Sequence, residues 1–247
     1  MVTLRLVAVI GLLLLGACAQ RPQLTAAGLP VLPPCPASSW QPEAPPPSAS
    51  PRASMVILAE QEWDRFGRQT ISYADGTAHV DHRGLNEQEM TERVHDYWRS
   101  VDEPQYSGLN TDVPWSAAFI SWDIASAGVP RDQFCPDDRH TIYIERLVDR
   151  ARQPDATLIP RRLSEYRPQV GDLICSSREG GRTSLDWLDR GPGHCDIVVS
   201  VRPSSLEAIG GNVDDSVSLS TFPLDANGFL SPISGRPFFT VIENRLP

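Results

Sequence analysis

The sequence predicts an α+β domain in which helices come first and an antiparallel sheet follows. Between about residues 54 and 152, apolar residues recur at helical spacing. After residue 170, short apolar runs alternate with Gly- and Pro-rich turns, which is typical of strands. A run of helices followed by a run of strands favours an α+β fold. The length of 247 residues suits one such domain with flanking segments.

The first 17 residues are typical of an export signal. Arg5 supplies a positive start, and the apolar core that follows, Leu6 to Leu15, is too short to span a membrane. The tetrapeptide LGAC that ends at Cys18 resembles the bacterial lipobox, which implies cleavage before Cys18 and attachment of lipid to it. By the same resemblance, Ala19 favours an outer-membrane anchor that faces the periplasm. The alternative is an ordinary signal peptide with a chance cysteine.

Residues 18–52 are predicted to form a lipidated, Pro-rich tether. Residues 20–52 hold ten of the 23 prolines of the chain, so this segment is expected to be extended rather than packed. At about 3.1 Å per residue it could reach roughly 100 Å from the bacterial membrane. The remaining residues, 53–247, are predicted to form a single folded domain.

Four helices are predicted, at residues 54–67, 86–101, 113–127 and about 141–152. Asn86 followed by Glu89 forms the pattern of a capping box. Asp112 is expected to cap the third helix, and Gly128 to end it.

Five strands are predicted, at residues 171–177, 195–201, 206–211, 217–222 and 238–243. The segment His79 to His82, HVDH, contains metal-ligand residue types. No further cluster supports it, so we interpret it as a solvated turn and predict no metal site.

Charge and composition exclude several functions. The net charge of −9 argues against a nucleic-acid partner, because phosphate binding requires a basic surface. All 22 basic residues are arginine, so a Ser-Lys dyad, a Schiff-base lysine and a phosphate-loop lysine are excluded. A histidine general base must be one of the five histidines of the chain.

Four short motifs occur in order along the domain. PWSAAF precedes a helix, GDLIC and GPGHCDIVVSV begin strands, and AIGGN ends a third strand. Together these motifs, from about Asp112 to Asn212, resemble the NlpC/P60 and CHAP superfamily of papain-like peptidases and amidases. This resemblance implies a papain-like fold with N-terminal helices packed on a small antiparallel sheet. The whole chain also resembles an uncharacterised family of proteobacterial envelope lipoproteins.

The resemblance assigns roles to individual residues. Ser116 falls on the nucleophile, His194 on the general base and Asn212 on the group that orients the histidine. Two departures stand out: the family nucleophile is Cys, and the family's acidic residue falls on Gly210. Asp196 lies two residues after His194, on the same strand face, so it could orient the ring in place of Asn212.

Two further residues are expected near the cleft of this site. Trp115 precedes the nucleophile position and either packs in the core or lines the cleft, where it would contact substrate. His140 lies near a helix start and could approach the same cleft.

Four cysteines follow Cys18, an even number that permits disulfides in an exported protein. Cys175 and Cys195 begin strands that are expected to be neighbours. Either a disulfide joins them or both are buried free thiols.

The expected activity is cleavage of an amide or peptide bond in peptidoglycan. A serine hydroxyl is far less acidic than a thiol, so Ser116 needs proton transfer to a base in the transition state itself. The rival expectation is an inactive module that keeps the cleft and binds cell-wall peptides or an envelope protein. Neither alternative requires a cofactor.

Overall fold

The computed structural model describes residues 31–42, 49–73, 75–178 and 183–247, and the predicted export signal and Cys18 lie outside these ranges. Residues 33–247 form one compact unit. None of the described helices combines the length and the apolar character that crossing a membrane requires. Within the described ranges the helices are α1 (Pro51–Arg65), α2 (Thr91–Ser100), α3 (Ser116–Ser126) and α4 (His140–Arg150).

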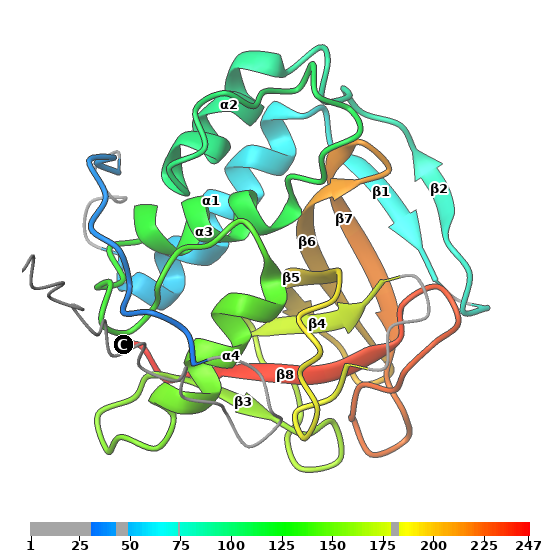
Figure 1. Ribbon diagram of the computed structural model, residues 1–247. Coiled ribbons are helices and arrows are strands. Elements are labelled where there is room, and N and C mark those ends of the chain that lie inside the picture. Colours follow the sequence, from blue (N-terminus) through cyan, green and yellow to red (C-terminus); the bar gives the residue numbers. More distant parts are fainter. Residues whose placement is uncertain (1–30, 43–48, 74, 179–182) are drawn as a thin grey trace, which may run out of the picture. The chain divides into compact units, whose positions relative to one another are not determined.

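One mixed sheet of eight strands lies against these helices (Figure 1). Its strand order is β2-β1-β7-β6-β5-β4-β8-β3, and every neighbouring pair is antiparallel except β1 and β7, which are parallel. The strands are β1 (Gln69–Ser72), β2 (His79–His82), β3 (Leu158–Arg161), β4 (Leu173–Ser177), β5 (Gly193–Val201), β6 (Ser205–Val213), β7 (Ser216–Pro223) and β8 (Phe238–Asn244).

The α+β class agrees with the prediction, but the sheet is larger than expected and is not purely antiparallel. Sequence reasoning missed β1, β2 and β3, which have four residues each and show too little alternation to be recognised. The segment His79–His82, interpreted as a turn, is the exposed edge strand β2. No three His, Cys, Asp or Glu side chains in the described residues gather closely enough to hold a metal ion.

The helix ends follow local capping chemistry only in part. Asn86 Oδ1 accepts from the Glu89 amide at 3.0 Å, and Glu89 Oε2 accepts from the Asn86 amide at 2.9 Å. This predicted capping box is confirmed, although it closes a turn and regular helix begins only at Thr91. The third helix begins at Ser116 with Trp115 as its N-cap, so the prediction that Asp112 caps it is wrong. Gly128, at a φ of 84°, ends this helix as expected.

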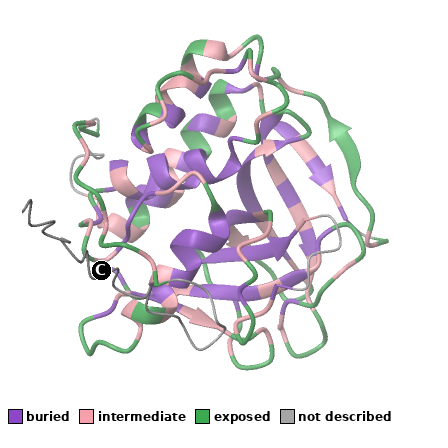
Figure 2. Cartoon of the chain, viewed as in Figure 1, coloured by how far each residue is buried: buried purple, intermediate pink, exposed green. Residues whose placement is uncertain are grey.

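Helix α3 is the centre of the molecule. Ten of its 11 residues are buried, and it packs against α1, α2, β5 and β6 (Figure 2). The alternating side chains of β4 divide the interior into two clusters. Leu173 and Cys175 face the cluster that includes the helices, whereas Ile174 joins a second cluster on the opposite face of the sheet. The start of α3 is therefore held between the helical layer and the middle of the sheet.

The described residues 33–42 of the Pro-rich segment are fastened to the domain. A disulfide joins Cys35 to Cys135, across a sequence separation of 100 residues. Arg131 donates to the Pro36 carbonyl at 2.8 Å, and Arg146 donates to the Pro33 carbonyl at 2.6 Å. The segment around Cys35 is thus part of the compact unit.

We predict that Cys35→Ser lowers the free energy of unfolding by about 3–5 kcal/mol, because the disulfide closes a long loop in the unfolded chain. Urea denaturation of the oxidised protein measures this change. Ser38→Ala is the matched control, since it removes only hydrogen bonds from the same segment, an exposed one to Asp102 and one accepted from the Trp40 amide, and leaves the disulfide intact. Equal stability of Cys35→Ser and Ser38→Ala would contradict the prediction.

Candidate active site

Ser116 is the first residue of α3 and is buried, with 2% of its surface exposed. Its hydroxyl lies 2.7 Å from Nε2 of His140. The first hydrogen bond of the helix is donated by Phe119 to the Trp115 carbonyl, so the amides of residues 116–118 have no carbonyl partner within the helix. These amides place the positive end of the helix dipole beside the Ser116 hydroxyl.

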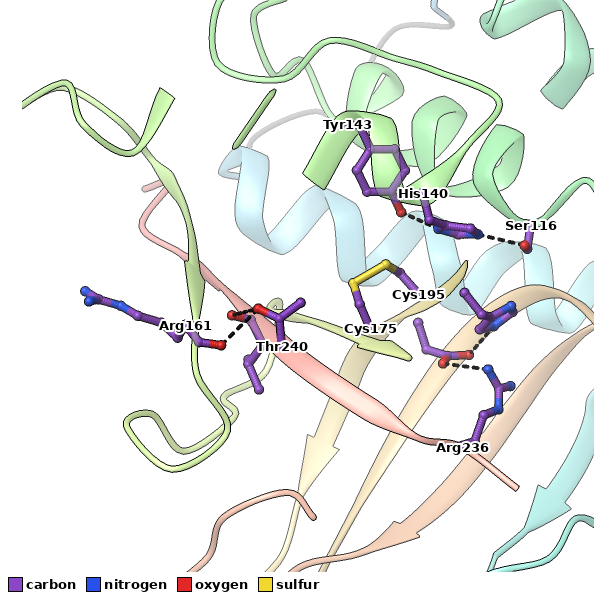
Figure 3. Close-up of a disulfide and its surroundings, with 11 residues drawn as sticks. Ser116, His140, Tyr143, Arg161, Cys175, Cys195, Arg236 and Thr240 are labelled. Atoms are coloured by element: carbon purple, nitrogen blue, oxygen red, sulfur yellow. Dashed lines mark hydrogen bonds and ion pairs between the residues drawn. A yellow bond between two sulfur atoms is a disulfide. The ribbon is translucent and has the colours of Figure 1, made fainter. Parts of the chain in front are cut away.

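His140 is the first residue of α4 and contacts two hydroxyl groups. Its Nε2 faces Ser116, and its Nδ1 lies 2.5 Å from the Tyr143 hydroxyl, three residues later on the same helix (Figure 3). If Nδ1 carries the ring proton and donates to Tyr143, Nε2 is free to accept the Ser116 proton. Ser116, His140 and Tyr143 therefore have the order of nucleophile, base and orienting group.

The surroundings keep this histidine neutral. Burial lowers the pKa of His140 well below its ordinary value, and the nearby His194 ring and the charges of Arg178 and Arg236 lower it further. Burial also raises the pKa of Tyr143 well above its ordinary value, so its hydroxyl keeps its proton. The pair is in the uncharged state that a resting Ser-His couple requires.

His194, the predicted base, occupies a different network. Its Nε2 lies 3.0 Å from Asp196 Oδ1, and its Nδ1 lies 2.9 Å from an Nη of Arg178. A guanidinium group only donates, so Nδ1 must accept and Nε2 must carry the proton. Burial, with the Arg236 charge, lowers the pKa of His194 to about 3. Both ring nitrogens are therefore occupied by partners other than Ser116.

The structure thus corrects one pairing derived from the sequence. The hydroxyl of Ser116 bonds to His140 and not to His194, although the two imidazole rings lie only 5.6 Å apart. His140 was expected only to approach the cleft. Gly193, the residue before His194, permits this approach of the start of α4, because a Cβ at position 193 would lie only 3.2 Å from His140 Cβ.

Asp196, rather than Asn212, contacts the His194 ring. Asp196 also lies 3.4 Å from Nη1 of Arg236. Asn212 has a φ of 56°, and its amide donates to Glu87 at 3.2 Å, so it does not orient the imidazole. Gly210 explains how Asp196 fits, because a Cβ at position 210 would lie 2.2 Å from Asp196 Oδ1. The carboxylate of Asp196 fills space that any larger residue at 210 would need.

Trp115 lies in the core and does not line the pocket at Ser116. Its ring is 1% exposed, stacks near Tyr97, and donates from Nε1 to Glu87 at 2.6 Å. Of the two readings of this residue from the sequence, the structure therefore favours packing over substrate contact.

Cys175 and Cys195 form a disulfide between the facing residues of β4 and β5 (Figure 3). The next pair in this register is Ser176 and His194. Side chains alternate along a strand, so the disulfide lies on the helix face while His194 points to the other side. The bridge fixes the two strands immediately beside the His194 network.

A pocket of about 310 Å³ opens beside Ser116. His140 and Ser116 line it, together with Trp98 and the Gly191 to Gly193 turn. Among the described residues, Arg139, Arg178, Arg190 and Asp138 also line it. Arg190 pairs with Glu145, and Arg139 lies within 4 Å of Asp137 and Asp138, so carboxylates balance these two guanidinium charges. The pocket could hold a small amide substrate with its carbonyl near the Ser116 hydroxyl.

Sequence reasoning missed Tyr143, Arg178 and Arg236. The spacing of His140 and Tyr143, three residues apart on a predicted helix, was a usable signal. The two arginines come from chain segments 58 residues apart, next to β4 and β8, so no local pattern could have joined them.

A family model described as "Uncharacterized protein conserved in bacteria (DUF2272)" matches residues 80–242, and the chain belongs to this family. Searches of curated proteins and of solved structures found no match. Ser116, His140 and His194 all fall inside the matched region.

We predict that Gly210→Ala lowers the free energy of unfolding by about 2–3 kcal/mol, because the new methyl group overlaps the Asp196 carboxylate. Urea denaturation of Gly210→Ala, Asp196→Ala and the double variant forms a double-mutant cycle. The cost of Gly210→Ala should shrink by at least about 1 kcal/mol when Asp196 is alanine. Strictly additive costs would show that the contact with Asp196 is not the cause.

A second prediction concerns pH. The folded pKa of His194 lies below the unfolded value, so its contribution to stability is complete above about pH 6.5 and is lost as the pH falls toward 3. Between pH 7 and 5 this loss is about 2 kcal/mol. His194→Asn keeps an acceptor for Arg178 but cannot be protonated, so urea denaturation should give it a flatter pH dependence than the wild type. His82→Asn, on exposed β2, is the control and should match the wild type.

Proposed function

We propose that this protein is a serine-dependent amide hydrolase of the bacterial cell envelope, with Ser116 as nucleophile and His140 as general base. The observation that carries the proposal is the 2.7 Å contact between the Ser116 hydroxyl and His140 Nε2 beside a pocket of about 310 Å³. The absence of lysine from the chain leaves histidine as the natural base for this serine.

The reaction follows from the order of the three groups. The Ser116 oxygen attacks the amide carbonyl while its proton passes to His140 Nε2, and Tyr143 accepts the hydrogen bond from Nδ1. His140 then returns the proton to the leaving amine, which gives an ester on Ser116. A water molecule, deprotonated by His140, hydrolyses that ester and restores the serine.

The negative charge of the tetrahedral intermediate requires donors that are already in place. The amides of residues 116–118, which have no hydrogen-bond partner among the described residues, lie next to Ser116 and supply such donors without reorganisation. Ser116 is therefore close both to the base His140 and to the backbone amides that would hold the oxyanion.

We further propose that the scaffold is papain-like. In support, the nucleophile position lies at a helix start, His194 lies on β5 and Asn212 on the adjacent β6, in the order of the superfamily motifs. The acidic residue of the superfamily motif falls on Gly210 in this chain. The carboxylate of Asp196 occupies the space that a side chain at position 210 would need. The base differs from the superfamily pattern, because Arg178 and Asp196 occupy both ring nitrogens of His194, and Ser116 contacts His140 instead.

Peptidoglycan peptides are the proposed substrate class, and a lipid on Cys18 the proposed anchor. The guanidinium N–H donors around the pocket are of the kind that recognise peptide carboxylates. The compact unit begins at Pro33, 15 residues after Cys18, and a tether of 15 residues at about 3.1 Å per residue would span about 45 Å. This is about half the reach expected from residues 18–52, and it would confine the enzyme to wall material near the membrane.

One observation favours a second candidate, an inactive module that binds cell-wall peptides or an envelope protein in the same pocket. Burial lowers the pKa of His140, nearby Arg178 and Arg236 lower it further, and this weakens the imidazole as a base. A site of this kind would keep its affinity for anionic peptides and show no turnover.

We predict that Ser116→Ala and His140→Gln each lower kcat on soluble peptidoglycan fragments by about a thousandfold or more. Tyr143→Phe should lower kcat by roughly tenfold to hundredfold, because it removes the group that orients the imidazole. His194→Asn, the matched histidine control, should lower it by less than about tenfold. The reverse order of the two histidine variants would make His194 the base.

A fluorophosphonate reagent gives a readout that does not depend on the substrate, since it labels activated serines. The wild type should be labelled at Ser116, and Ser116→Ala should not. Absence of label in the folded wild type, together with binding of peptidoglycan fragments, would favour the inactive module.

A further inference from the structure

A second cavity, of about 500 Å³, lies on the other side of Arg178 from the Ser116 pocket. The two cavities share only Arg178 among their lining residues. Eight of the eleven described residues that line this second cavity are polar: Tyr73, Ser176, Ser177, Arg178, Asn212, Asp214, Ser234 and Arg236, with Val213, Gly235 and Pro237 as the others.

The guanidinium group of Arg236 lines this cavity, and several contacts hold it in place. Its Nε donates to the Tyr73 hydroxyl at 3.1 Å, and its Nη1 lies 3.4 Å from Asp196. The guanidinium carbon lies 5.7 Å from the Tyr73 ring centre and 5.8 Å from that of Phe222. The side chain is fixed by these contacts, and within the described residues its Nη2 has no hydrogen-bond partner.

Ser176 gives an independent sign of a ligand. It is 1% exposed, lines the cavity, and its hydroxyl has no partner among the described residues. A buried hydroxyl without a partner loses free energy unless a ligand or water satisfies it. The strand register places Ser176 opposite His194, near the point where Arg178 and Arg236 meet the cavity.

The hydrogen-bond donors favour an anion. Arg178 and Arg236 line the cavity beside the Ser176 hydroxyl, and the one carboxylate among its described lining residues, Asp214, is paired with Arg83 at 2.8 Å. Arg236 is also paired with the fully buried Asp196, which holds its guanidinium group in place. Guanidinium groups and hydroxyls are the donors that proteins use for carboxylate and phosphate oxygens.

We propose that this cavity is a binding site for a small organic oxyanion, held by Arg178, Arg236 and the Ser176 hydroxyl. Carboxylate and phosphate share the chemistry that these donors recognise. The volume leaves room for a polar body beside the charged group. The site is separate from the Ser116 hydroxyl and does not depend on turnover.

Titration calorimetry and amide NMR spectra of the protein test this site with three probes: N-acetylglycine, its neutral amide, and inorganic phosphate. N-acetylglycine or phosphate should bind saturably and shift the Ser176 and Gly235 amides, whereas the neutral amide should not. The response to N-acetylglycine against that to phosphate identifies the preferred oxyanion. Absence of saturable binding by both anions would overturn the proposal.

Two serine variants locate the site. Ser176→Ala should weaken anion binding by about tenfold, because it removes a hydrogen bond to a charged group. Ser220→Ala is the matched control: its hydroxyl is also buried and without a partner in the described residues, but it lies on β7 away from the cavity. Removing an unpaired hydroxyl should leave both variants folded. Equal affinities of the two variants would contradict the proposal.

A third variant separates this site from the Ser116 pocket. Arg139 lines only that pocket, so Arg139→Gln should leave anion affinity unchanged. A loss of affinity in Arg139→Gln but not in Ser176→Ala would place the anion beside Ser116 and overturn the proposal. Measuring all variants in a Ser116→Ala background keeps the result independent of the proposed hydrolase activity.

Discussion

The buried carboxylate of Asp196 is the constraint on which the site depends. A fully buried charge is tolerated only when it is paired, and Asp196 has His194 on one side and Arg236 on the other. Its pKa is lowered, since these neighbours outweigh the burial that opposes ionisation. Because Asp196 accepts from His194 Nε2, the other ring nitrogen must accept, and Arg178 is the donor that it meets. The Asp196 carboxylate thus fixes the tautomer of His194. It holds Arg236 directly and Arg178 through His194, and it requires glycine at position 210.

This network also divides the interior into two compartments with different chemistry. On one side, Ser116 and His140 form an uncharged pair beside a pocket. On the other side, Arg236 and Ser176 line a polar cavity. Arg178 lines both cavities, and its hydrogen bond to His194 holds it in the wall between them. The Cys175–Cys195 bridge holds β4 and β5 in register at this wall, which limits how far the two strands could shift.

The sequence was informative where local chemistry decides the structure. Motif order located Ser116 at a helix start, and the pattern of Asn86 and Glu89 identified a capping box. The sequence was uninformative about contacts that depend on how distant segments pack together. His140 reaches Ser116 because α4 packs on the start of β5, and that contact leaves no trace in residue spacing. The short strand β1 pairs in parallel with β7, some 150 residues later, so its four residues gain their order from a partner that periodicity cannot reveal.

The electrostatics of His140 decide between hydrolase and binding module. Each unit by which its pKa is lowered removes about 1.4 kcal/mol from the driving force of proton transfer. One well-placed oxyanion donor contributes about 3–4 kcal/mol in known serine hydrolases. Two amides at the start of α3 could therefore offset a depression of several pKa units, provided that the substrate carbonyl reaches them. A carboxylate on the substrate, held near Arg178, would also oppose the charge that lowers the His140 pKa. The base would then gain strength when substrate binds, which reconciles a neutral resting imidazole with catalysis.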